Sequence, residues 1–224
     1  MNLKVNKTMI SFSEIPAIAA ESLNTRLLVR HSFRESLKQG NYDPGLTAEG
    51  FEYAKECGSR LKGMKDVCFG ASNRKRTMET VRAIIEGAGF ESSEIVPCPL
   101  LHDTAIFEDP ATLGKIIEDG TIPHLLKEYF YTGKAAGFTD VRDFSKTLSS
   151  FLTETEFRQK NVILASHDIV IVALLVPFEI YPFQQDDWFG YLHGAFLRQD
   201  LDRNWEIFYA VPDKSNRTRY SLFI

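Results

Sequence analysis

Residues 25 to 32 read Thr-Arg-Leu-Leu-Val-Arg-His-Ser, a short apolar run that ends in polar side chains. This pattern is typical of a parallel strand, because helices cover both faces of such a sheet and bury both sides of the strand. Residues 161 to 166 read Asn-Val-Ile-Leu-Ala-Ser and form the clearest run of this kind in the chain. Each run leads directly into a histidine, His31 and His167 respectively. The sequence therefore predicts two buried strands, each with a histidine at its carboxyl end.

Strands and helices alternate over the rest of the chain. Residues 67–71 predict another buried strand, and Ile95-Val96 predicts a short one. Apolar spacing and terminal residues predict helices from about Thr47 to Leu61, from Arg74 to Ala88 before Gly89, and from Ile169 to Val176. Two last strands, Tyr191 to Leu197 and Trp205 to Val211, predict a hairpin. This alternation indicates a three-layer α/β/α fold around a mostly parallel sheet.

The predicted organisation is a single domain over residues 1–224. Residues 1–24 show no clear period, and we interpret them as an N-terminal extension that includes a helix packed on the domain. Residues from about 100 to 157 hold helical patterns separated by prolines and glycines, and they predict a small helical cap. Neither an internal repeat nor a long linker indicates a second domain.

Composition argues against several classes of function. The 224 residues are 44% hydrophobic and 25% charged, which is ordinary for a globular protein. The net charge of −4 argues against a nucleic-acid-binding protein, which is usually basic. The apolar runs are too short to span a membrane, and the three cysteines lack metal-ligand or disulfide spacing. We therefore expect a cytoplasmic protein with no nucleic-acid or membrane partner; the sequence does not indicate an oligomeric state.

Three predicted strand ends carry imidazole or cationic groups. The first ends in Arg30-His31 with Arg34 beyond it, the second leads into residues 72–76, and the third leads into Ser166-His167-Asp168. Ligands bind outside the carboxyl ends of parallel strands, so these groups are expected to share one crevice. Arginine offers paired donors that suit phosphate, and surrounding positive charge keeps an imidazole neutral and nucleophilic. A single histidine is more often structural, but the three strand ends together predict a phosphate site.

Four elements, in this order, resemble the histidine phosphatase (phosphoglycerate mutase-like) superfamily. The first element, Leu27 to Ser32, is similar to the family's strand and Arg-His-Gly signature, with Ser32 in place of glycine. The second and third are Leu46 to Gly50, which matches Leu-Thr-x-x-Gly, and Ser72 to Thr80, which matches Ser-x-x-x-Arg-x-x-x-Thr. The fourth, Ala165 to Asp168, carries the second histidine. Each element alone is a weak signal, and their order is what indicates the family. The resemblance implies a phosphoglycerate mutase-like fold.

The resemblance implies a two-step phosphoryl transfer that needs no metal or organic cofactor. His31 would attack the substrate phosphorus, and water would then hydrolyse the resulting phosphohistidine. The residues expected at the phosphoryl group are Arg30, Arg34, Arg76, His167 and Ser32. The expected partner is a small phosphorylated substrate; a phosphopeptide is also open, because a small cap leaves the site accessible.

The acid that protonates the leaving group is open between carboxylates. One branch of the family places it directly after the second histidine, where Asp168 stands. The other branch places it in the loop before the cap, where Leu101-His102-Asp103 resembles that site with Asp in place of Glu. We favour Asp103, because the short cap resembles the smaller branch. Asp168 could instead cap its helix, and Glu108 is a further candidate.

Ser32 leaves the activity itself open. Glycine at this position allows close backbone approach or a positive φ, and serine would be strained in that conformation. A catalytically inactive phosphate-binding member is therefore an alternative, as is a phosphoglycerate mutase-type enzyme that returns the phosphoryl group to its substrate. The leading hypothesis is a phosphatase that hydrolyses phosphomonoesters through a phosphohistidine on His31.

Overall fold

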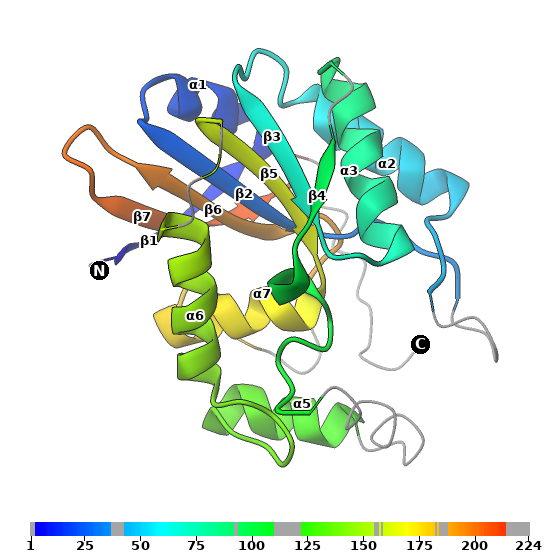
Figure 1. The fold of residues 1–224 in the computed structure, drawn as a ribbon, viewed down its shortest axis with the longest axis vertical. Coiled ribbons are helices and arrows are strands. Elements are labelled where there is room, and N and C mark those ends of the chain that lie inside the picture. Colours follow the sequence, from blue (N-terminus) through cyan, green and yellow to red (C-terminus); the bar gives the residue numbers. More distant parts are fainter. Residues whose placement is uncertain are drawn as a thin grey trace.

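The computed structural model describes residues 3–36, 43–91, 94–109, 122–154, 157, 159–181, 183 and 188–213. In chain order its elements are β1 (Leu3–Ser11), η1 (Phe12–Glu14), α1 (Ile15–Ala20), β2 (Asn24–Arg30), α2 (Ala48–Ser59), β3 (Val67–Ala71), α3 (Lys75–Ala88), β4 (Ile95–Pro97), η2 (Pro99–Leu101), α5 (Ile122–Thr132), α6 (Val141–Glu154), β5 (Asn161–Ser166), α7 (Asp168–Leu175), η3 (Val176–Phe178), β6 (Gly194–Gln199) and β7 (Trp205–Val211). Helices lie on both sides of one sheet (Figure 1). The predicted three-layer α/β/α fold is confirmed.

The described strands form one sheet in the order β1-β7-β6-β2-β5-β3-β4. The pairs β1–β7, β2–β5, β3–β5 and β3–β4 are parallel, whereas β2–β6 and β6–β7 are antiparallel. The sheet is thus mostly parallel, as predicted. Strands β2, β5 and β3 are adjacent and parallel, so their carboxyl ends lie side by side at one edge of the sheet.

The two faces of β2 divide the hydrophobic core into two clusters. Leu27 and Val29 belong to a cluster with residues of α1, α2 and α3, whereas Leu28 belongs to a cluster with residues of α5, α6 and α7. Successive side chains of a strand point to opposite faces, and both faces of this strand are covered. This explains why β2 reads as a continuous apolar run without alternating polar residues.

The ends of α2 and α3 follow local rules that the sequence already displays. The Thr47 hydroxyl accepts a hydrogen bond from the Gly50 backbone N–H at 2.9 Å and caps the start of α2. Gly89 ends α3 in the left-handed region with φ of 69°. Arg74, predicted as the first residue of this helix, is its N-cap. As a result, Arg76 lies in the first turn of α3, at the carboxyl end of β3.

The sequence prediction missed one strand and placed the start of another too early. The N-terminal extension contains the predicted helix, α1, but it also contains β1, an edge strand parallel to β7 that the sequence did not predict. The register of β1 shifts between Val5 and Met9, which breaks the alternation that would have marked a strand. The strand predicted from Tyr191 begins at Gly194, because Leu192 has φ of 60° and turns the chain before β6.

The segment predicted as a cap divides into two parts. Helix α6 packs on α7, and its residues Phe144 and Leu148 belong to the same core cluster as Leu28 of β2, so α6 is part of the layer covering the sheet. Helix α5 lies farther from the sheet (Figure 1). Residues 110–121 of the predicted cap lie outside the described residues. Within the described part of the chain, no helix has the length and apolar character needed to cross a membrane.

Candidate active site

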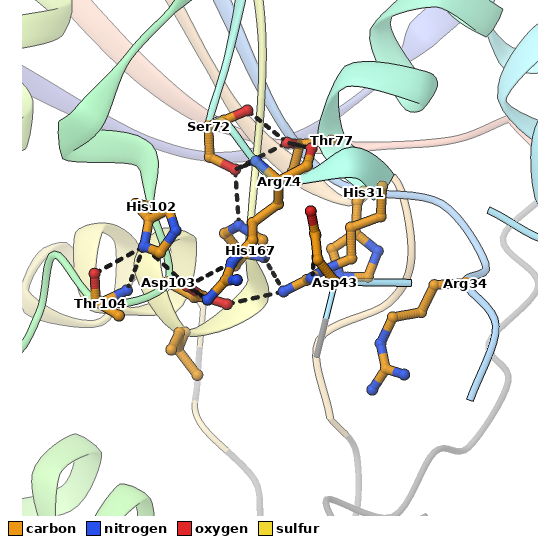
Figure 2. A network of polar contacts seen from close by, with 12 residues as sticks. His31, Arg34, Asp43, Ser72, Arg74, Thr77, His102, Asp103, Thr104 and His167 are labelled. Atoms are coloured by element: carbon orange, nitrogen blue, oxygen red, sulfur yellow. Dashed lines mark hydrogen bonds and ion pairs between the residues drawn. The ribbon is translucent and has the colours of Figure 1, made fainter. Parts of the chain in front are cut away.

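Three neighbouring strand ends bring the predicted residues together. His31 follows β2, Ser72 follows β3 and His167 follows β5. The His31 backbone N–H donates to the Ser166 carbonyl oxygen at 2.9 Å, and the Ser72 N–H donates to the Ala165 carbonyl oxygen at 3.1 Å. These bonds extend the pairing of the strands past their ends, so the three segments leave the sheet together and form one polar site (Figure 2).

His31 is buried and held in one orientation. Its Nδ1 lies 2.8 Å from the Ser32 carbonyl oxygen. Since a carbonyl can only accept, Nδ1 carries the proton and Nε2 keeps its lone pair. Burial and then the charges of Arg30 and Arg76 hold the pKa of His31 well below 6.5. His31 is therefore a neutral imidazole whose Nε2 can act as a nucleophile.

His167 lies between Ser72 and Arg76. Its Nε2 is 2.9 Å from the Ser72 hydroxyl, and its Nδ1 is 3.2 Å from Nη2 of Arg76. A guanidinium can only donate, so Nδ1 accepts and Nε2 carries the proton. Burial, followed by the charge of Arg76, lowers the pKa of His167 to about 3. The two histidine rings, with centroids 5.6 Å apart, are thus both neutral.

Asp103 is surrounded by donors (Figure 2). Nη2 of Arg76 donates to its Oδ2 at 2.8 Å, Nη2 of Arg74 donates to its Oδ1 at 3.1 Å, and Nδ1 of His102 lies 3.0 Å from Oδ1. Burial alone would raise the pKa of this carboxyl, but the hydrogen bond with His102 and the neighbouring positive charges hold it well below its usual range. Asp103 is therefore an ionised carboxylate in direct contact with the predicted phosphate-binding arginine.

Asp168 makes a separate ion pair with Arg30. Its Oδ2 lies 2.8 Å from Nη2 of Arg30 and accepts a hydrogen bond from the Trp188 indole at 2.7 Å. Nη1 of Arg30 donates to the Phe189 carbonyl oxygen. Burial would raise the pKa of Asp168, but the charge of Arg30 and the bond from Trp188 lower it. The two candidate acids thus lie in different surroundings, each paired with a different predicted phosphate-binding arginine.

Within the described residues, no group of three or more His, Cys, Asp or Glu side chains is placed to hold a metal ion. The polar groups that converge at the site are imidazoles, guanidiniums and carboxylates, with the Ser72 hydroxyl behind them.

A family model described as the histidine phosphatase superfamily, branch 1, matches residues 27–198. This range begins within β2 and contains α3, β5 and both histidines of the site. The chain belongs to the histidine phosphatase superfamily. The predicted family is thereby confirmed. None of the curated proteins matches this sequence closely enough to count as a relative.

Solved structures share the fold of this histidine phosphatase at low sequence identity. A mycobacterial glucosyl-3-phosphoglycerate phosphatase in complex with inorganic phosphate is 17% identical, with a TM-score of 0.55 over 88% of this chain and 98% of its own. A phosphoserine phosphatase variant from Entamoeba histolytica in complex with phosphoserine is 16% identical, with a TM-score of 0.55 over 87% of this chain and 99% of its own. A phosphoglycerate mutase from Bacillus anthracis is 14% identical, with a TM-score of 0.52 over 86% of this chain and 94% of its own. These likenesses show the fold.

The strain expected at Ser32 is not present in this histidine phosphatase. Among the described residues other than glycine, positive φ values occur at Asp66, Glu179, Leu192 and Arg203, and not at Ser32. Ser32 is fully buried, and its N–H donates to the Thr80 hydroxyl at 3.0 Å. Serine is therefore compatible with the backbone next to the nucleophile candidate.

Two other predicted residues lie at the margin of the site. Arg34 is half-buried and donates to the Glu35 carbonyl oxygen at 2.9 Å, and its guanidinium lies apart from the network around His167 (Figure 2). Glu108 is exposed, and its backbone N–H donates to the Gly137 carbonyl oxygen at 3.1 Å. Neither residue makes one of the described contacts with His31 or His167.

Several residues of the site were not predicted. Arg74 lies within the element Ser72 to Thr80, and its position at the start of the predicted helix was the signal that could have placed it in the site. The indole of Trp188 donates to Asp168. The ring of Tyr191 lies 4.1 Å from Cζ of Arg30. No local pattern marks Trp188 or Tyr191, because their partners are far away in the sequence.

Proposed function

We propose that this histidine phosphatase superfamily member hydrolyses phosphomonoesters through a phosphohistidine on His31, without a metal ion. The observation that carries the proposal is the hydrogen bond between His31 Nδ1 and the Ser32 carbonyl oxygen at 2.8 Å. This bond leaves the Nε2 lone pair for attack, and the low pKa of His31 keeps the lone pair available near neutral pH. We expect the substrate to be a small phosphorylated molecule.

Arg30 and Arg76 are the groups we assign to the phosphoryl oxygens, together with His167, whose Nδ1 would donate once it carries a proton in place of accepting from Arg76. Phosphoryl transfer requires mainly positioning and neutralisation of charge, which guanidinium groups provide. Nη2 of Arg76 donates to Asp103 and His167, whereas Nε and Nη1 have no hydrogen-bond partner among the described residues, so a phosphoryl group would bind through these two atoms or displace the partners of Nη2. Arg34, at the margin, is placed to contact a more distant part of a substrate.

The proposed reaction proceeds in two displacements. His31 Nε2 attacks phosphorus in line, a P–N bond forms, and the ester P–O bond breaks as the protonated Asp103 gives its proton to the leaving oxygen. Water then attacks the phosphohistidine, its proton passes to Asp103, the P–N bond breaks and orthophosphate leaves. Nδ1 of His31 keeps its proton throughout. Its N–H donates a hydrogen bond to the Ser32 carbonyl oxygen, and this bond stabilises the positive charge that develops on the ring.

Asp103 suits the role of acid better than Asp168 because of the partners that lower its pKa. Arg76 and Arg74 are cations that a phosphoryl group would also attract, so substrate binding weakens their hold on the Asp103 carboxylate and allows it to take up a proton. Arg30, the cation that lowers the pKa of Asp168 most, would be attracted to the phosphoryl group in the same way, but the Trp188 indole and the Ile169 backbone N–H would keep their bonds to Asp168 in the presence of substrate.

The first test is hydrolysis of para-nitrophenyl phosphate in the presence of EDTA by the wild type, by His31→Ala and by His124→Ala. His124 is exposed on α5 and serves as the matched control. We expect turnover by the wild type and the control, and none above background by His31→Ala. An acid-labile phosphorylated protein trapped from the wild type alone would identify the phosphohistidine.

Other outcomes separate the alternatives. Turnover that persists in His31→Ala would contradict the proposal. A folded wild type that binds orthophosphate without turnover would instead be a phosphate-binding protein, and transfer of the phosphoryl group to a phosphoglycerate in place of water would indicate a mutase.

A further inference from the structure

We propose that Asp168 and Trp188 are positioning residues that orient Arg30 toward the phosphoryl group, and that Asp168 is not the proton donor. This inference rests on the proposed function, because it assigns a role within the same site. It separates the two carboxylates that the sequence left as alternatives: one would exchange a proton, and the other would hold a guanidinium in place.

The guanidinium of Arg30 is held by the protein on several sides. Nη2 lies 2.8 Å from Asp168, Nη1 donates to the Phe189 carbonyl oxygen, and the ring of Tyr191 lies 4.1 Å from Cζ. Arg30 is 7% exposed, and its Nε has no hydrogen-bond partner among the described residues. The plane of the group is therefore fixed, while one hydrogen on each terminal nitrogen is left to donate to a ligand.

Both oxygens of Asp168 are already engaged by donors. Oδ1 accepts from the Ile169 backbone N–H at 2.9 Å, and Oδ2 accepts from the Trp188 indole at 2.7 Å in addition to Arg30. A general acid must carry a proton on one oxygen, and neither of these two donors is a group that a substrate would displace. The arrangement suits a permanent carboxylate that orients its cation.

Trp188 is itself fixed by packing. It is 6% exposed, and its ring centroid lies 6.0 Å from that of Phe130 on α5 and 5.6 Å from that of Phe183. A rigid indole gives Asp168 one orientation, and Asp168 in turn gives Arg30 one orientation. Preorganisation of this kind strengthens ligand binding, because the Arg30 side chain loses less conformational freedom when it binds a phosphoryl oxygen.

The test compares Asp168→Asn, Trp188→Phe and Asp103→Asn in three measurements. The first is the affinity for orthophosphate, and the other two are kcat/KM for an aryl ester, para-nitrophenyl phosphate, and for an alkyl ester, glycerol 2-phosphate. Trp188→Phe keeps an aromatic ring and removes only the N–H donor, so it also covers the case in which Asp168→Asn does not fold. Trp205→Phe is the matched control, because Trp205 packs on Arg26 at the other end of the strands.

We expect Asp168→Asn and Trp188→Phe to weaken orthophosphate binding, by about tenfold for the first and severalfold for the second. Both should lower kcat/KM for the two esters by the same factor, since Arg30 acts on the phosphoryl group whatever the leaving group is. Asp103→Asn should instead lower the alkyl ester rate much more than the aryl ester rate, because only the poor leaving group needs a proton. Adding Asp168→Asn to Arg30→Gln should cause no further loss of affinity.

Three results would overturn the inference. A selective loss of the alkyl ester rate in Asp168→Asn would make Asp168 the acid. Tighter phosphate binding in Asp168→Asn would make Asp168 a competitor of phosphate for Arg30. Unchanged phosphate affinity in both Asp168→Asn and Trp188→Phe would show that neither residue positions Arg30. The orthophosphate measurement does not depend on turnover. A wild type without phosphatase activity would therefore contradict the proposed function, while weaker phosphate binding by Trp188→Phe would still support the role of Arg30 positioning.

Discussion

At the scale of single residues, we expect Asp103 to couple anion binding to proton uptake. Its pKa is held well below the usual range by His102 and the nearby cations, so it is ionised before an anion binds. An anion that draws Arg74 and Arg76 away removes this stabilisation and raises the pKa of Asp103, so binding should become tighter as pH falls. Sulfate is the suitable probe, because it keeps both charges over the range used.

We predict that the sulfate affinity of the wild type rises as pH falls from about 6 toward the ordinary carboxyl pKa of 3.8, by at most about tenfold per pH unit for one proton. Calorimetric titration at several pH values measures this, and Asp103→Asn should show a weaker dependence. That variant keeps His31 and His167, so the difference between the two slopes belongs to Asp103. Equal slopes in the two proteins would show that the carboxylate takes up no proton.

Residues that follow a strand could be predicted from the sequence, whereas residues that meet only through the fold could not. His31, His167 and Arg76 stand beside apolar runs, and the edge of a parallel sheet brings such positions together. Trp188 and Tyr191 reach Arg30 from a segment without a local pattern, and the pairing of Asp168 with Arg30 depends on the neighbouring positions of β2 and β5. Sequence reasoning therefore found the candidate acids but could not distinguish their surroundings.

At the scale of elements, the position of Arg76 depends on how α3 packs against α2. A β-carbon on Gly58 would lie 2.5 Å from the Ile84 carbonyl oxygen, and one on Gly87 would overlap the Lys55 carbonyl oxygen. Glycine lets the two helix backbones approach closely at both positions. Because Arg74 and Arg76 stand at the start of α3, any separation of the helices also displaces the two arginines that contact Asp103.

We predict that Gly87→Ala lowers the free energy of unfolding by about 1–3 kcal/mol, since the contacted atom belongs to rigid backbone. Alanine gains about 1 kcal/mol of helix propensity, so the packing cost must exceed that gain. Urea unfolding measures the change, with Glu52→Ala on the exposed face of α2 as a control expected to change stability by less than about 0.5 kcal/mol. A Gly87→Ala protein as stable as the wild type would show that the helices can separate without cost.

Elements with strong local signals were predicted closely, and those governed by tertiary contacts were not. Thr47 and Gly89 mark helix ends through their own hydrogen bonding and backbone conformation, so α2 and α3 could be placed from the sequence. Strand β1 is formed by pairing with β7, more than 190 residues later in the chain, and its own pattern is interrupted by a shift in register. The assignment of α6 to the sheet layer likewise follows from its packing on α7.

At the scale of the whole molecule, folding buries two neutral histidines at the carboxyl ends of β2 and β5. The pKa of His31 lies well below 6.5 and that of His167 is about 3, whereas both titrate near 6.5 in the unfolded chain. At pH values between 6.5 and the lowered pKa values of the two histidines, the unfolded chain binds more protons than the folded chain. The free energy of unfolding therefore decreases as pH falls below 6.5. Asp103 and Asp168 have lowered pKa values, so the stability they contribute is lost only below their ordinary value of 3.8.

We therefore predict that the free energy of unfolding falls from about pH 6.5 to about pH 4.5, by up to about 1.4 kcal/mol per pH unit for each buried histidine. Urea unfolding across this window measures the slope, which is best taken above about pH 5.5, because glutamates such as Glu206 titrate near 4.5 in the unfolded chain. The double variant His31→Gln/His167→Gln should have a shallower slope, whereas His124→Gln, changed at an exposed position, should keep the slope of the wild type. A wild type and double variant with the same slope would show that the two histidines are not held neutral by the fold, and the basis for a nucleophilic His31 would be lost with it.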